Sequence, residues 1–136
     1  MSTQLIPYLS FAGNAEEVLN FYKEALGGEI VLMNRYGKSP MPCDEDYKDK
    51  VMHARFVFDG NMIMISDAFK GRPVGFNGNI QLSVVMNDAE KLETTFNKLA
   101  EGGKIQMPLQ VQFWGDTFGM LLDKFGVSWM FNCEKK

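Results

Sequence analysis

Two segments of the chain carry apolar residues at the spacing of an amphipathic helix. In the first, residues 14–28 (NAEEVLNFYKEALGG), positions i, i+4, i+7 and i+8 form one apolar face made of Val18, Tyr22, Ala25 and Leu26. Asn14, with Glu17 three residues later, has the pattern of a capping box. The segment closes on Gly27 and Gly28, which suit a left-handed helix end. We therefore predict a helix that is capped by Asn14 and ends at the double glycine.

The second segment, residues 88–103 (DAEKLETTFNKLAEGG), repeats this pattern further along the chain. Its apolar face has the same spacing and consists of Leu92, Phe96, Leu99 and Ala100. This segment also closes on a double glycine, Gly102 and Gly103. A second helix of the same kind is predicted.

Each predicted helix is preceded by one strand-like segment and followed by three. In the first half these segments are residues 5–11, 29–37, 50–58 and 61–67; in the second half they are 79–86, 104–114, 116–123 and 127–134. Both halves therefore read β-α-β-β-β, and the fold class is α+β. One helix covers only one face of a four-stranded sheet, so we expect the halves to pack with helices outside and a cavity between the sheet faces.

The length of 136 residues fits one compact domain rather than two. We place a single domain over residues 1–136, built from module 1 (about 4–68) and module 2 (about 78–134). The modules differ most in residues 38–49 (KSPMPCDEDYKD), a long connection in module 1. This loop is interpreted either as a lid or binding loop or as a solvated excursion, and its Asp44–Asp46 acidic run either as a site for a hard cation or as solvated charge.

Charge and composition exclude several function classes. The net charge is −3, the pI is about 5.1, and Lys and Arg do not cluster on any predicted element, so no nucleic-acid partner is expected. The chain has no long apolar run for a membrane span, and the N-terminal MSTQLIPYLSF lacks a signal-peptide pattern. We expect a cytoplasmic protein with no membrane partner.

Three segments carry a resemblance to a known family. They begin at Pro7 (PYLSFAGNAEEVLNFYKEALGG), at Met41 (MPCDEDYKDKVMHARF) and at Met107 (MPLQVQFWGDTFGMLLDKFGVSWMFNCE). Together with the tandem modules they resemble the PhnB-like branch of the vicinal oxygen chelate superfamily, which includes glyoxalase I, extradiol dioxygenases and bleomycin resistance proteins. The resemblance covers essentially the whole chain and implies a homodimer. Members of that branch are often labelled demethylubiquinone methyltransferase-like, but the chain has no glycine-rich loop after its first strand to hold a nucleotide-type cofactor.

The resemblance also implies four inward positions at which the metal enzymes of the superfamily place His, Glu or Gln. They fall here near Pro7, at Met64, at Met130, and at Asn79 or, in a register shifted by two, Gln81. Proline offers no donor atom, and a thioether is a soft, weak ligand for divalent ions. We therefore expect no resident metal or other cofactor.

Strand alternation from these positions predicts the lining of the cavity. The predicted lining residues are Leu9, Met62, Met64, Ser66, Asn79, Gln81, Ser83, Trp114, Ser128 and Met130. This lining mixes apolar groups with amides and hydroxyls and suits an uncharged or weakly polar small molecule. The methionines and Trp114 are equally open to interpretation as packing residues.

His53 is the only histidine and the best titratable candidate, as an acid or base or as a hydrogen-bonded part of the scaffold. Tyr8, Tyr36 and Tyr47 are further polar candidates. Two functions follow. The first is a metal-free protein that binds a small organic molecule. The second is an enzyme acting on a small oxygenated substrate through His53 or through a divalent metal in another register.

Overall fold

The computed structural model of the protein describes residues 3–40, 42–75 and 79–134, and the expected start of module 2 at residue 78 lies outside them. The chain divides after Gly75 into two compact units. Each unit is a β-α-β-β-β module with one helix and one mixed sheet, so the predicted α+β class is confirmed.

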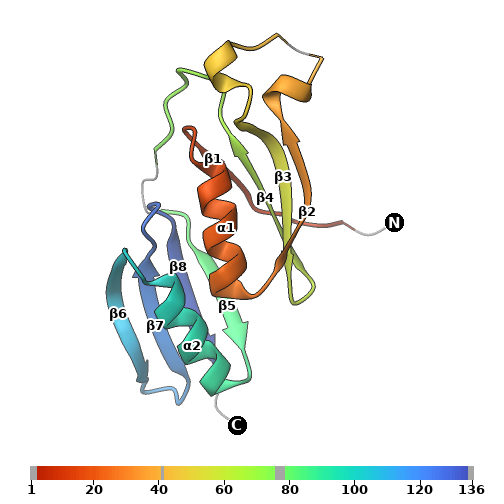
Figure 1. Cartoon of the computed structure of the whole chain (residues 1–136). Coiled ribbons are helices and arrows are strands. Elements are labelled where there is room, and N and C mark those ends of the chain that lie inside the picture. Colours follow the sequence, from red (N-terminus) through yellow and green to blue (C-terminus); the bar gives the residue numbers. More distant parts are fainter. Residues whose placement is uncertain (1–2, 41, 76–78, 135–136) are drawn as a thin grey trace. The chain divides into compact units, whose positions relative to one another are not determined.

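Unit 1 contains a sheet with the strand order β1-β4-β3-β2, in which β1 runs parallel to β4 and the other pairs are antiparallel (Figure 1). Its strands are β1 (Tyr8–Phe11), β2 (Glu29–Arg35), β3 (Val51–Phe58) and β4 (Asn61–Asp67). Its helices are α1 (Ala15–Leu26) and two short 3-10 turns, η1 (Tyr36–Lys38) and η2 (Glu45–Tyr47).

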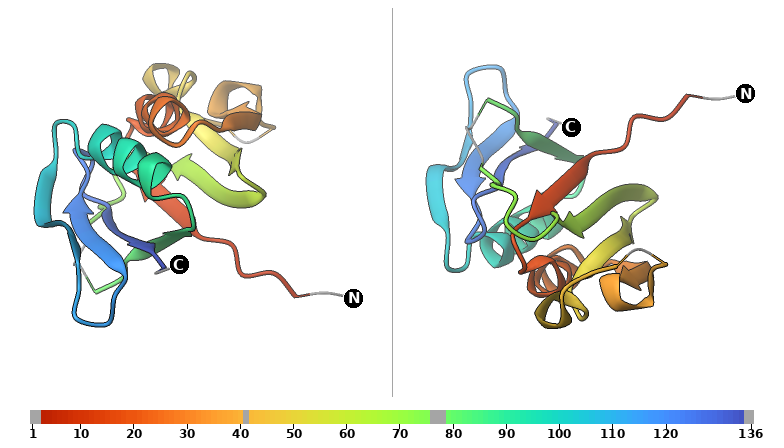
Figure 2. Two further views of the ribbon diagram at one scale, coloured as in Figure 1. Left: turned by 90° about the horizontal axis from the view of Figure 1, so that it is seen from below. Right: turned by 90° about the horizontal axis from the view of Figure 1, so that it is seen from above.

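Unit 2 repeats this topology with the strand order β5-β8-β7-β6. Its elements are β5 (Leu82–Met86), α2 (Ala89–Leu99), β6 (Lys104–Val111), β7 (Thr117–Leu122) and β8 (Ser128–Cys133). In both units the helix lies along one face of its own sheet, as Figures 1 and 2 show. We call the opposite side of each sheet its helix-free face.

The predicted apolar faces of both helices are confirmed, except that Ala100 lies beyond the end of α2 and is only partly buried. Val18 and Tyr22 on α1 are completely buried, as are Phe56 and Ile65 on the strands beneath. On α2, Leu92, Phe96 and Leu99 are at most 1% exposed, and the Phe96 ring meets Phe131 edge-on with centroids 5.5 Å apart. Burying each such side chain contributes about 1.5–3 kcal/mol, so each unit has its own apolar core between helix and sheet.

The predicted cap of α1 is wrong. The Asn14 side chain makes no capping hydrogen bond. Instead the buried carboxylate of Asp67 accepts hydrogen bonds from the Gly13 and Ala15 N–H groups, each 2.9 Å, and thereby holds the start of the helix. A residue 52 positions away has taken the role that a local cap would have had.

Two further bounds differ from expectation. Helix α2 ends at Leu99 with Ala100 as its C-cap, before the double glycine, whereas α1 ends as predicted on the left-handed Gly27. Strands β1 and β5 begin three residues later than predicted because regular pairing starts only at Tyr8 and Leu82. Pro7 has no N–H to pair, although its carbonyl accepts a hydrogen bond from the Met64 N–H at 3.0 Å.

Candidate functional site

The helix-free face of unit 1 gathers polar side chains from three strands. Cross-strand pairing joins Tyr8 to Met64 and Met64 to Arg55, which puts these three side chains in one row. His53 lies two residues before Arg55 on β3 and so shares its face. Met62, two residues before Met64, lies on the same side. This face therefore combines two thioethers with a phenol, an imidazole and a guanidinium.

Leu9 is not part of this face, contrary to expectation. It pairs with Ile65, a completely buried residue of the helix-covered side. Parallel partners project to the same side of a sheet, so β1 presents Tyr8 and Ser10 to the helix-free face instead. The predicted inward position near Pro7 was one residue out of register. Ser66, the partner of Ser10, remains on the predicted side and is 6% exposed.

Tyr8 and His53 are brought together across β4. The Tyr8 hydroxyl lies 3.2 Å from His53 Nδ1, and the two ring centroids are 5.7 Å apart. In the tautomer protonated at Nε2, the hydroxyl donates to Nδ1 and leaves the Nε2–H as a donor. The pair can therefore orient a ligand oxygen or exchange a proton with it.

Arg55 is the residue that the sequence interpretation missed. Nothing in its sequence neighbourhood forms a motif, but the alternation that placed His53 inside β3 also places Arg55 on the same side. The alternation along β3 is therefore the sequence signal that identifies Arg55 as a residue of this face.

The helix-free face of unit 2 is more apolar. Met130 pairs with Ser83 on one side and Met120 on the other, so the predicted orientations of Met130 and Ser83 agree with the pairing. Asn132, on the same side of β8, donates a hydrogen bond to the Asp116 carboxylate at 3.2 Å. Ser128 is 7% exposed and pairs with Leu122.

Three of the predicted lining residues lie outside the strands of unit 2. Asn79 and Gln81 precede β5, and Trp114 lies in the turn between β6 and β7. Trp114 is 49% exposed and makes edge contacts with Phe113 and Phe118. Phe118 pairs with Asn132 on the helix-free face of unit 2, so Trp114 lies against that face, whereas Asn79 and Gln81 take part in no strand pairing.

The side chains around Met64 and Met130 on the helix-free faces are poor donors for a divalent ion. Pairing places Tyr8 beside Met64 and Ser83 beside Met130, and the two thioethers are soft, weak ligands. Among residues 3–40, 42–75 and 79–134, no three or more His, Cys, Asp and Glu side chains gather closely enough to hold a metal ion.

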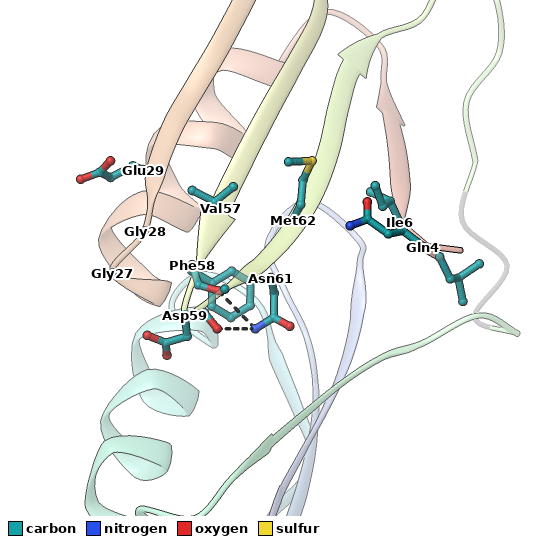
Figure 3. A pocket seen from close by; sticks show the side chains of 12 residues that line it. Gln4, Ile6, Gly27, Gly28, Glu29, Val57, Phe58, Asp59, Asn61 and Met62 are labelled. Atoms are coloured by element: carbon teal, nitrogen blue, oxygen red, sulfur yellow. Dashed lines mark hydrogen bonds between the residues drawn. The ribbon is translucent and has the colours of Figure 1, made fainter. Parts of the chain in front are cut away.

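An open groove of about 640 Å³ lies at one end of unit 1 (Figure 3). It is lined by the segment before β1, the end of α1 and the β3–β4 hairpin. Val57 and Met62, from the helix-free face, form part of its wall (Figure 3). Leu5, which also lines the groove, is 98% exposed, so this groove is open to solvent rather than enclosed.

The loop of residues 38–49 is anchored rather than free, although Met41 lies outside the described residues. The Tyr36 hydroxyl, just before the loop, donates to the Asp67 carbonyl at 2.7 Å, and the Tyr47 hydroxyl donates to the Ala68 carbonyl. Burial raises the pKa of both phenols, with a further contribution from the charge of Asp67. Both tyrosines are thus structural contacts of the loop.

The acidic run in this loop is paired with lysines. Lys70 lies 2.8 Å from the Asp46 carboxylate and 3.2 Å from that of Asp44, and Lys48 lies 2.9 Å from Glu45. The hydrogen bond from Lys70 lowers the pKa of Asp46. These contacts do not indicate a cation site at the run.

A further ion pair joins α1 to the end of β2, and its contribution to stability depends on pH. The Arg35 guanidinium donates a bidentate pair of hydrogen bonds to the Glu16 carboxylate, at 2.8 and 3.0 Å. These hydrogen bonds lower the pKa of the Glu16 carboxyl. A depressed pKa stabilises the fold above the ordinary carboxyl range and loses this contribution as the pH falls through the folded value. The pair is half exposed, so its contribution is at most about 1 kcal/mol.

We expect Glu16→Gln to lower the free energy of unfolding by less than about 1 kcal/mol at pH 7. The difference from the unsubstituted protein should shrink as the pH falls below about 4, where the carboxyl protonates. Urea unfolding at several pH values measures both quantities. A difference that persists unchanged at low pH would contradict this assignment, because Gln then differs from the acid in something other than charge.

Residues 3–131 match the family described as 3-demethylubiquinone-9 3-methyltransferase. The chain belongs to this family. A curated relative, YjdN of Escherichia coli strain K12, is 33% identical over 142 residues, which span 97% of this chain and 96% of YjdN. The family assignment agrees with the resemblance to the PhnB-like branch.

Solved structures of the family carry the same fold. PA1353 from Pseudomonas aeruginosa matches with 43% identity and a TM-score of 0.89, over 99% of this chain and 100% of PA1353. A putative 3-demethylubiquinone-9 3-methyltransferase, PhnB protein, from Bacillus cereus matches with 34% identity and a TM-score of 0.81, over 97% and 100% of the two chains.

A more distant structure has a similar fold. A glyoxylase/bleomycin resistance protein/dioxygenase domain from Frankia sp. EAN1pec matches with 15% identity and a TM-score of 0.71, over 99% of each chain. At that identity the likeness concerns the fold alone. Within the described residues, neither helix is long and apolar enough to cross a membrane.

Proposed function

We propose that the protein binds a small organic molecule on the helix-free faces of its sheets without a resident metal. The observation that carries this proposal is the composition of the unit 1 face: Tyr8 and His53 form a positioned polar pair beside Met62 and Met64. Such a combination of apolar surface with a few fixed polar groups is typical of small-molecule sites. The thioethers at two of the superfamily's ligand positions support a site that works without a divalent ion.

The methyl transfer in the family's description is not part of this proposal. The connection between β1 and α1 contains one glycine, Gly13, where a nucleotide-type cofactor site would need a glycine-rich turn. Moreover, the Gly13 and Ala15 N–H groups at the start of α1 are bound to Asp67 and are not free to bind a cofactor.

Thermal unfolding of chelator-treated protein tests the metal-free site. A ligand that binds only the folded state raises the melting temperature in a saturable way. We expect no saturable rise with Ni²⁺, Co²⁺, Zn²⁺, Mn²⁺, Fe²⁺ or Mg²⁺, and a rise with members of a panel of small organic molecules. A saturable rise at one equivalent of any of these ions would contradict the metal-free proposal.

A second candidate function is acid–base catalysis by His53 on a small oxygenated substrate. The hydrogen bond between Tyr8 and Nδ1 favours this candidate because it orients the imidazole ring, which a general acid or base requires. Disappearance of a bound organic molecule over time in the same samples would favour the enzyme, and its persistence would favour the binding protein.

We also propose a homodimer. Each sheet ends in two edge strands in the described part of the chain, β1 and β2 in unit 1 and β5 and β6 in unit 2. Edge strands of this kind are commonly covered by pairing with another chain. Light scattering that gives the 15.4 kDa mass of one chain would contradict this proposal.

A further inference from the structure

Arg55 is an exposed cation in the middle of the helix-free face of unit 1. Its cross-strand neighbours in the row are Met64 on β4 and Leu32 on β2, neither of which can accept its N–H groups strongly. Among the described residues Arg55 forms no ion pair and no side-chain hydrogen bond. A guanidinium presents five donors in a fixed plane, and here all of them are available to a ligand.

The polar groups around Arg55 are also able to donate. Tyr8 lies in the same row, on the far side of Met64, and its hydroxyl is bonded to His53 Nδ1. His53 is two residues from Arg55 on the same strand, which places their Cα atoms about 6–7 Å apart. An acceptor group placed over Met64 would therefore lie between the guanidinium and the Tyr8–His53 pair.

Two carboxylates of unit 1, those of Asp67 and Glu16, are engaged away from Arg55. Asp67 accepts three backbone N–H groups, and Glu16 is paired with Arg35. Glu29 is the acidic residue on the same face: it pairs with Val57, in the row next to that of Arg55. No ion pair joins Glu29 to Arg55, so the positive charge is left for a ligand.

We propose that Arg55, together with the Tyr8–His53 pair, binds the carboxylate of a small organic acid whose apolar part rests on Met62 and Met64. This inference rests on the proposed function and names its ligand class. The planar fork of arginine matches the two oxygens of a carboxylate. A single positive charge balances a monoanion, whereas a phosphate dianion would leave uncompensated negative charge near Glu29. The site therefore selects organic acids over their neutral analogues.

Pairs of acids and matched primary amides test this selection on the full chain. Benzoate with benzamide, and hexanoate with hexanamide, differ in charge while the apolar part stays the same. Titration followed by ¹H–¹⁵N NMR measures weak affinities and places the binding residues. We expect each acid to bind at least about tenfold more tightly than its amide, because a charge-assisted hydrogen bond is worth about 1.5–3 kcal/mol.

Variants connect the selection to Arg55. Arg55→Met keeps an apolar stem and should abolish the preference for the acid while the amide binds as before. Arg72→Met, which removes an exposed arginine outside the sheet, is the matched control and should change nothing. Glu29→Gln removes the nearby negative charge and should strengthen binding of the acid.

The possible outcomes distinguish failure of the carboxylate site from failure of the proposed binding function. Amides that bind as tightly as the acids, or an unchanged preference in Arg55→Met, would overturn the carboxylate site and leave the proposed function intact. If no acid and no amide shifts the resonances of the helix-free face at millimolar concentration, both the carboxylate site and the proposed binding function are overturned.

Discussion

Replacing Asp67 with alanine is expected to lower the free energy of unfolding by about 3–5 kcal/mol, a large share of the 5–15 kcal/mol typical of a domain. Asp67 is 1% exposed, and its two oxygens accept hydrogen bonds from the N–H groups of Gly13, Ala15 and Val51, each at 2.9 Å. Alanine would leave these buried donors without an acceptor. The start of α1 and the start of β3 would both lose the group that joins them to the end of β4.

Two further variants show whether the loss comes from these bonds. Asp67→Asn keeps one oxygen but turns an NH₂ group towards an N–H donor, so an intermediate loss is expected. Asp88→Ala removes the exposed cap of α2, whose side chain accepts bonds from Glu90 and Lys91 N–H, and should cost only about 1 kcal/mol. Urea unfolding followed by circular dichroism measures all three. Equal decreases in the free energy of unfolding for Asp67→Ala and Asp88→Ala would contradict the claim that burial makes the Asp67 hydrogen bonds more costly to lose.

The contrast between these two aspartates explains what the sequence could predict. Helix faces depend on residues three and four positions apart, so Val18 and Tyr22 or Leu92 and Phe96 can be recognised locally. The capping of α1 depends on a strand that follows 52 residues later, and no local pattern distinguishes that arrangement from a cap by Asn14. Non-local hydrogen bonds of this kind were therefore missed.

The same distinction between local and non-local contacts decides which parts of the candidate site could be predicted from the sequence. The orientation of Met64 and Met130 follows from counting along β4 and β8 from the turn glycines, Gly60 and Gly126. The orientation of β1 cannot be obtained by such counting. Tyr8 lies beside Met64 because β1 pairs in parallel with β4, a strand far along the chain. Leu9 was misplaced for that reason, and the Tyr8–His53 bond could not be anticipated.

Gly28→Ala and Gly103→Ala are each expected to destabilise the protein by about 3 kcal/mol or more, at the upper end of the cost of overpacking. A Cβ atom on Gly28 would lie 2.3 Å from the Val57 carbonyl oxygen, and one on Gly103 would lie 2.2 Å from that of Leu122. Both obstacles are backbone atoms of a neighbouring strand, so no side chain can turn away to make room. The chain would have to separate the strand that follows the helix from its partner.

The preceding glycine of the first pair supplies the control. Gly27 has a φ of 72° and no atom within 4 Å of an added Cβ, so Gly27→Ala should cost only about 1 kcal/mol of backbone strain. The two glycines of this pair thus act differently: Gly27 ends the helix and Gly28 allows close strand packing. Urea unfolding measures the decrease in the free energy of unfolding for Gly27→Ala and for Gly28→Ala. If Gly27→Ala costs as much as Gly28→Ala, the helix end rather than the strand contact is what requires glycine in this pair.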